Sequence, residues 1–154
     1  MKPCKYFAIE ELTPPGHQNW SLLDDRLCEL IDEMHEFLGK IYDRHGFRFI
    51  MRVNTWHKGG KFTLRGWRPQ VCSTGSQRSK HKLGQAIDFE AFLVDLADGS
   101  EREIDPEEIR GHLRDGKLKQ GKLKYLGGME TDISWIHVDC RGNGESLIQF
   151  KGIV

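Results

Sequence analysis

The stretches SKHKLGQAID at residues 79–88 and WIHVD at residues 135–139 decide how this chain folds around a site. They contain His81, Asp88 and His137, each in or beside a predicted strand. A catalytic zinc ion typically takes three protein ligands from histidine and carboxylate side chains and keeps a fourth position open. His81 and Asp88 are too far apart for one strand face or one helical turn, but a loop that doubles back would bring them onto one ion. The pattern therefore predicts a metal site.

Carboxylates near His137 are candidates for the base that a catalytic zinc site needs for its water. Asp139 follows His137 by two residues, so on a strand both side chains point the same way. Asp139 could hold the second ring nitrogen of His137, as carboxylates do in many metal sites, or it could accept a proton from water. Glu130 and Asp132, which we expect in the loop before this strand, are the other candidates. The residues alone leave the choice open.

Upstream of these stretches, hydrophobic periodicity predicts a long helix that belongs to the core. Apolar residues recur at three- and four-residue steps through residues 23–42, which is typical of an amphipathic helix. Ser21 is the expected N-cap, with Asp24 three residues later as in a capping box, and the helix should end near Gly46. A second helix is expected at residues 105–115, because an aspartate at the cap position precedes a proline.

Strands are predicted at residues 47–53, 85–96 and 134–140, and a polar loop at residues 72–79 leads to the first metal stretch. Helices and strands do not alternate strictly. We therefore expect an α+β fold, with a small antiparallel sheet and flanking helices. A chain of 154 residues can bury one sizeable core but not two, so residues 1–154 should form a single domain.

The composition argues against several classes of partner. Lysine plus arginine and aspartate plus glutamate balance at 23 each, so no overall field draws the protein to nucleic acid or to an anionic membrane. No run approaches the ~18–20 apolar residues that span a bilayer. The N-terminus lacks the apolar core of a secretory signal, which predicts synthesis in the cytoplasm. The partner must therefore be inferred from the site.

The two metal stretches closely resemble those of the zinc D-alanyl-D-alanine carboxypeptidase family, a family of murein peptidases that shares its core with the Hedgehog signalling domain. The shared pattern is S-x-H-x-x-G-x-A-x-D at residues 79–88, followed by WIHVD at residues 135–139. YFAIEEL at residues 6–12 resembles the N-terminal motif of the short phage and prophage members. RGWR at residues 65–68 resembles the family's glycine–aromatic–arginine element. The resemblance covers nearly the whole chain and implies a Hedgehog-like zinc core.

The resemblance implies a role for each matching residue. His81, Asp88 and His137 match the zinc ligands. Arg68 matches the arginine that contacts the substrate and stabilises charge on the scissile carbonyl, an effect on the order of 2.7–4 kcal/mol for one donor. Ser79 matches a position that would orient the loop carrying His81.

The chain departs from the family near its last ligand, His137. Many members have a histidine two residues before that ligand or a glutamate three residues before it, and here those positions are Trp135 and Ser134. The resemblance therefore does not assign the general base. Asp139 is our first choice for it and Glu130 the second.

The family implies a zinc-dependent peptidase that hydrolyses a peptide bond in bacterial peptidoglycan, of the D-Ala-D-Ala carboxypeptidase or endolysin type. Its partner would be a peptidoglycan stem peptide or a related D-amino-acid peptide, with no nucleic acid or membrane. The protein would be a monomer that acts on the cell wall after release. Two alternatives stay open: a non-catalytic, zinc-containing module that binds cell wall or protein, and a cytosolic zinc dipeptidase. A base within reach of the metal would favour an enzyme.

Overall fold

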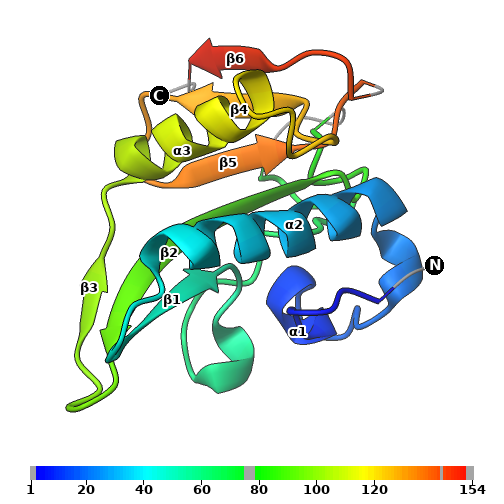
Figure 1. The fold of residues 1–154 in the computed structure, drawn as a ribbon. Coiled ribbons are helices and arrows are strands. Elements are labelled where there is room, and N and C mark those ends of the chain that lie inside the picture. The colour runs from blue at the N-terminus through cyan, green and yellow to red at the C-terminus, as the bar shows by residue number, and fades with distance from the viewer. Residues whose placement is uncertain (1–2, 75–78, 143, 152–154) are drawn as a thin grey trace.

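The computed structural model describes residues 3–74, 79–142 and 144–151, which form one mixed sheet with helices beside it (Figure 1). Part of the predicted loop at residues 72–79 lies outside the described residues. The helices are α1 (Ile9–Leu12), α2 (Asp25–Tyr42) and α3 (Pro106–Leu118), with the short 3-10 helices η1 (Trp20–Leu22) and η2 (Trp56–Lys58). The strands are β1 (Phe47–Arg52), β2 (Ala86–Asp95), β3 (Glu101–Glu103), β4 (Gly128–Thr131), β5 (Ile136–Asp139) and β6 (Ile148–Lys151).

The sheet has the strand order β1-β2-β5-β4-β6, and β3 pairs with the second half of β2. Among these strands every pairing is antiparallel except that of β4 with β6, which makes the sheet mixed. Helices α2 and α3 lie on the same face of the sheet (Figure 1). The predicted α+β fold with flanking helices is confirmed. In the part of the chain that the structure describes, no helix has the length and apolar character needed to cross a bilayer.

Helix α2 begins one residue after Asp24, whose side chain caps it by accepting a backbone hydrogen bond of the first turn at 2.9 Å. The prediction of Ser21 as the N-cap is wrong, because that residue lies in η1. A tertiary contact decides between the two: the backbone N–H of Asp24 donates to the carbonyl oxygen of Gly84 at 2.9 Å, which anchors the chain at this point. The helix ends at Tyr42, and Gly46, with φ of +86°, serves the turn into β1 instead.

Strand β2 separates the core from the opposite face of the sheet. Ile87, Phe89 and Ala91 alternate along the strand and are fully buried on the side of the helices. Asp88 and Glu90 occupy the positions between them, so their side chains point to the other face. One strand therefore supplies both the core and the face on which a site can form.

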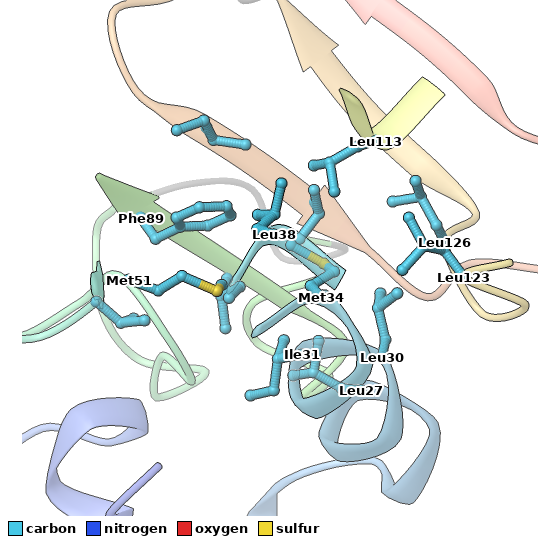
Figure 2. Packing of buried hydrophobic residues seen from close by; sticks show 14 of the residues in the cluster. Leu27, Leu30, Ile31, Met34, Leu38, Met51, Phe89, Leu113, Leu123 and Leu126 are labelled. Carbon is cyan, nitrogen blue, oxygen red and sulfur yellow. The ribbon is translucent and has the colours of Figure 1, made fainter. Parts of the chain in front are cut away.

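The core lies between the sheet and the apolar side of α2 (Figure 2). Buried side chains recur along α2 at three- and four-residue steps, as its amphipathic pattern predicts. They pack against side chains of β1, β2 and α3. The labelled members of this cluster are Leu27, Leu30, Ile31, Met34, Leu38, Met51, Phe89, Leu113, Leu123 and Leu126. Because protein cores are close-packed, this contact gives β2 a rigid support.

Strands β3, β4 and β6, which the sequence analysis did not predict, contain only three or four residues each. Strand β4 occupies the segment that we expected to be a loop, so Glu130 lies on a strand and the loop prediction is wrong for this residue. Asp132 follows β4 as an exposed residue with φ of +59°. The difference is relevant to function, because a strand position sets where the Glu130 side chain lies relative to β5.

Candidate metal centre

Three side chains from separate segments meet on the sheet face opposite α2 and α3. His81 comes from the turn before β2, Asp88 from β2 itself and His137 from β5. One ligand atom of each lies within 4.8 Å of the others, and all three residues are buried. Asp88 and His137 are direct partners in the antiparallel register, which by itself brings these two side chains together. The cluster could hold a metal ion, and it consists of the three residues predicted as ligands.

A tight turn delivers His81 to the cluster. Gly84 has a φ of +69°, and a Cβ atom there would lie 2.1 Å from the carbonyl oxygen of Leu22. Glycine alone tolerates both this dihedral angle and this approach without strain. The backbone N–H of His81 also donates to Ser79 Oγ at 3.3 Å, a contact consistent with the orienting role expected for Ser79.

The ring of His81 is oriented by a hydrogen bond on the side away from the cluster. Its Nδ1 lies 2.8 Å from the carbonyl oxygen of Gly66, which can only accept, so Nδ1 carries a proton. Its Nε2 faces Asp88 Oδ1 at 3.3 Å and is the nitrogen available to a metal. Gly66 is itself packed against Leu12, because a Cβ atom on Gly66 would lie 2.2 Å from the Leu12 carbonyl oxygen. Metal-binding histidines commonly have their second nitrogen held in this way.

Both ring nitrogens of His137 contact carboxylates. Nδ1 lies 2.9 Å from Asp88 Oδ1, and Nε2 lies 3.0 Å from Asp139 Oδ2. Asp139 is fully buried, and both of its oxygens also accept hydrogen bonds from Arg141. The sequence allowed two roles for Asp139, and this geometry matches the one in which it holds the ring of His137. Nδ1 is then the nitrogen that faces Asp88 and is available to a metal.

The charges in the cluster favour a cation between the carboxylates. Burial would raise the pKa of Asp88, but the charges and hydrogen bonds of His81 and His137 hold that pKa well below its usual range. Burial would lower the pKa of His137, but hydrogen bonds to Asp139 and Asp88 raise it to about 9. The two carboxylates therefore favour positive charge at this position. A divalent ion that displaced the Nδ1 proton would preserve the positive charge between these carboxylates, so the residues fit a metal.

Arg68 contacts the cluster at its edge. Its Nη2 donates to Asp88 Oδ2 at 3.2 Å, and its Nε donates to the carbonyl oxygen of Leu64 at 2.7 Å. The backbone N–H of Arg68 donates to the carbonyl oxygen of His81 at 3.2 Å, which connects this segment to the metal loop. The side chain of Arg68 is only 12% exposed, and its guanidinium is held in direct contact with a candidate ligand.

Glu130 lies on the opposite side of His137 from Asp88. Strands β4 and β5 pair Glu130 directly with His137, so both side chains point to the same face of the sheet. The residue is half-buried, and its carboxylate accepts no hydrogen bond from any group that the structure describes. Its negative charge acts on both Arg68 and Arg141. A carboxylate in this position is chemically able to accept a proton beside the metal ligands.

Two contributors to the site, Arg141 and Phe150, were not identified from the sequence. Arg141 follows Asp139 by two residues, so the alternation that linked His137 to Asp139 could have been extended to it. Phe150 on β6 is paired in register with Glu130, and its ring contacts that of His137 edge-on at a centroid distance of 5.7 Å. Strand β6 is largely exposed and gave no periodic signal.

Comparison of the chain with models of known protein families, with curated proteins and with solved structures finds no match. The function of the site must therefore be inferred from the residues that form it. These are a buried His–Asp–His cluster able to hold a metal ion, an arginine in contact with it and a carboxylate on the neighbouring strand.

Proposed function

We propose that this protein is a zinc-dependent peptidase that hydrolyses a peptide bond in bacterial peptidoglycan. The observation that carries the proposal is the buried cluster of His81, Asp88 and His137, whose ligand atoms lie within 4.8 Å of one another. Two histidines and a carboxylate are typical ligands of a catalytic zinc ion that keeps a further position open. The second nitrogen of each histidine is bonded as well, in one to a backbone carbonyl and in the other to a carboxylate.

A zinc ion held by these residues would polarise the scissile carbonyl group and lower the pKa of a water molecule to about 7. His81 would bind it through Nε2, because its Nδ1 donates to Gly66. His137 would bind it through Nδ1, because its Nε2 is directed at Asp139. The remaining tasks, proton transfer and binding of the substrate, fall to neighbouring side chains.

We assign Glu130 as the general base. Its carboxylate lies on the same face as His137 and accepts no hydrogen bond from the described residues. Asp139 suits this task less well, because it is fully buried and both of its oxygens are bonded. Burial would raise the pKa of Asp139, but hydrogen bonds from His137 and Arg141 lower it to about 2, which makes it a weak proton acceptor. Glu130 would take a proton from the attacking water and pass it to the leaving amine.

Arg68 is suited to bind the substrate beside the metal. Its guanidinium is held by Asp88 and by the carbonyl of Leu64, so it would need little rearrangement when charge develops on the carbonyl oxygen. One such donor contributes on the order of 2.7–4 kcal/mol to transition-state stabilisation. The substrate class, a peptidoglycan stem peptide, rests on the resemblance of residues 79–88 and 135–139 to the zinc D-alanyl-D-alanine carboxypeptidases.

The experiment is digestion of purified murein, and of synthetic stem peptides ending in D-Ala-D-Ala, followed by liquid chromatography and mass spectrometry. Zinc-loaded wild type is expected to release D-alanine or to cut within the stem. His137→Ala is expected to lose both cleavage and bound zinc, the latter measured by elemental analysis. If wild type binds zinc but cleaves no muropeptide, the proposed peptidase activity is wrong, and the alternative of a zinc-containing binding module remains. Wild type without bound zinc would contradict the metal centre itself.

A further inference from the structure

Arg141, directly after β5, binds the carboxylate of Asp139 with three donors. Its Nε lies 2.7 Å from Oδ1, its Nη2 lies 2.6 Å from Oδ2, and its backbone N–H donates to Oδ1 at 3.2 Å. Two parallel bonds from a guanidinium restrict a carboxylate in both distance and angle, which a lysine cannot do. Asp139 is fully buried, so these contacts are not in competition with bulk water.

The neighbours of Arg141 hold the guanidinium in turn. Gly128 is paired with Asp139 in the sheet, and a Cβ atom on Gly128 would lie 2.3 Å from Asp139 Oδ1 and 2.4 Å from Arg141 Nε. The ion pair thus fills the space that a side chain at position 128 would need. On β6, the ring centroid of Phe150 lies 4.6 Å from the guanidinium carbon of Arg141, and the same ring contacts His137.

These contacts form a chain that ends at a candidate metal ligand. Arg141 fixes Asp139, and Asp139 Oδ2 faces His137 Nε2 at 3.0 Å. We infer that Arg141 is a positioning residue, which holds Asp139 so that His137 keeps its proton on Nε2 and presents Nδ1 to the metal. The inference rests on the metal centre of the proposed function and adds a residue that acts on a candidate ligand through Asp139. A competing role for Arg141, whose side chain is 26% exposed, is direct binding of the substrate.

Zinc affinity of the variants Arg141→Met and Arg141→Lys, measured by competition with a chromophoric chelator, tests the inference without use of activity. Loss of an outer partner of a metal-binding histidine typically weakens metal binding by about 10–100-fold, and because Arg141 acts on His137 through such a partner, we expect Arg141→Met to lose affinity by up to this amount. Arg141→Lys keeps the charge but loses the paired geometry, so its affinity should fall between that of wild type and that of Arg141→Met. In the zinc-loaded wild type, nitrogen-15 NMR should show His137 with a proton on Nε2 alone, and Arg141→Met should lose this single state.

Arg52 offers a matched control. It binds Glu101 with two bonds of 2.8 Å each, and its guanidinium carbon lies 4.5 Å from the ring centroid of Phe92. Arg52→Met therefore removes the same kind of ion pair and ring contact at a residue that, in the described part of the chain, forms no hydrogen bond, ion pair or ring contact with His81, Asp88 or His137. We expect Arg52→Met to bind zinc as wild type does. An equal loss of affinity in Arg52→Met and Arg141→Met would overturn the inference, because it would reflect general destabilisation.

The remaining outcomes separate this inference from the proposed function. If both Arg141 variants bind zinc with wild-type affinity and the His137 signals are unchanged, the positioning role is wrong while the metal centre stands. If the Arg141 variants have a raised KM for the stem peptide but unchanged zinc affinity, the positioning role is also wrong, and Arg141 binds the substrate directly. If Arg141→Met does not fold, Arg141→Lys decides by the same two measurements. If wild type and His137→Ala bind zinc equally, the metal centre itself fails.

Discussion

The two candidate histidine ligands present different ring nitrogens, Nε2 in His81 and Nδ1 in His137, because their outer hydrogen bonds differ. His81 is held by the backbone carbonyl of Gly66, so a mutation removes this bond only where it shifts the backbone, as a side chain at position 66 would. His137 is held by Asp139, a side chain that single substitutions can alter. The orientation of His137 is therefore the more vulnerable of the two to mutation.

Glu130→Gln tests the assignment of the base. The amide keeps the size of the carboxylate but cannot accept the proton, so kcat on stem peptides should fall by about 10²–10⁴-fold. Zinc content should stay at the wild-type level, because Glu130 is not one of the three clustered ligands. Asp132→Asn is the control, since Asp132 lies exposed beyond the end of β4. A Glu130→Gln variant with wild-type kcat would return the role to Asp139.

His35 on α2 gives a prediction for the pH dependence of stability. Burial lowers its pKa below the ordinary 6.5, and its ring stacks on Tyr6 at a centroid distance of 4.4 Å. The unfolded chain therefore binds a proton more readily than the folded one, so the contribution of His35 is complete above about pH 6.5 and is lost as the pH falls. In urea titrations with chelator at pH 7 and pH 5, wild type should lose more unfolding free energy than His35→Gln. Equal losses would contradict this.

At the scale of elements, the N-cap of α2 also supports the metal loop. Asp24 Oδ2 accepts a hydrogen bond from Gln85 Nε2 at 3.2 Å, and the Asp24 N–H donates to Gly84. Asp105 caps α3 through a bond of 3.1 Å to Glu107, away from that loop. Replacing either aspartate by alanine should lower the free energy of unfolding by about 0.5–2 kcal/mol. Zinc titration should show weaker binding only for Asp24→Ala, and equal affinities would refute the link between helix and loop.

The long elements were predictable because their side chains repeat over many residues. Helix α2 has 18 residues and β2 has ten, enough for the 3.6- and two-residue periods to be recognised. Strands β3, β4 and β6 are too short for a period, and they owe their conformation to pairing with other strands of the sheet. The cap of α2 was misassigned for a related reason: Ser21 and Asp24 both suit the position, and the contact with Gly84 chooses between them.

The residues of the site likewise include some that the sequence could predict and others that depend on the fold. His81, Asp88 and His137 could be selected together because their spacing matches a known motif. The loop position expected for Glu130 hid its pairing with His137, which depends on the register of β4 against β5. The carbonyl of Gly66, which orients His81, could not have been predicted, because a backbone carbonyl has no residue-specific signal.

At the scale of the whole molecule, a metal bound by His81, Asp88 and His137 would connect a loop and two strands that are distant in sequence. Zinc at about 100 times its dissociation constant should raise the free energy of unfolding by about 2.7 kcal/mol. Calorimetry should record a higher Tm with zinc than with chelator for wild type and no difference for His137→Ala. The same shift in both proteins would mean that zinc binds elsewhere.

Strand β2, with Ile87 and Phe89 toward the core and Asp88 toward the candidate ligands, has a consequence for how the protein can evolve. Insertion or deletion of one residue in a strand exchanges its two faces. Such a change in β2 would turn Asp88 inward and apolar side chains outward at once. Substitutions can alter stability or chemistry separately, but length variation in this strand cannot. Natural and engineered changes in chain length should therefore accumulate in the loops between strands and helices. The alternation of inward and outward side chains along β2 should remain constant.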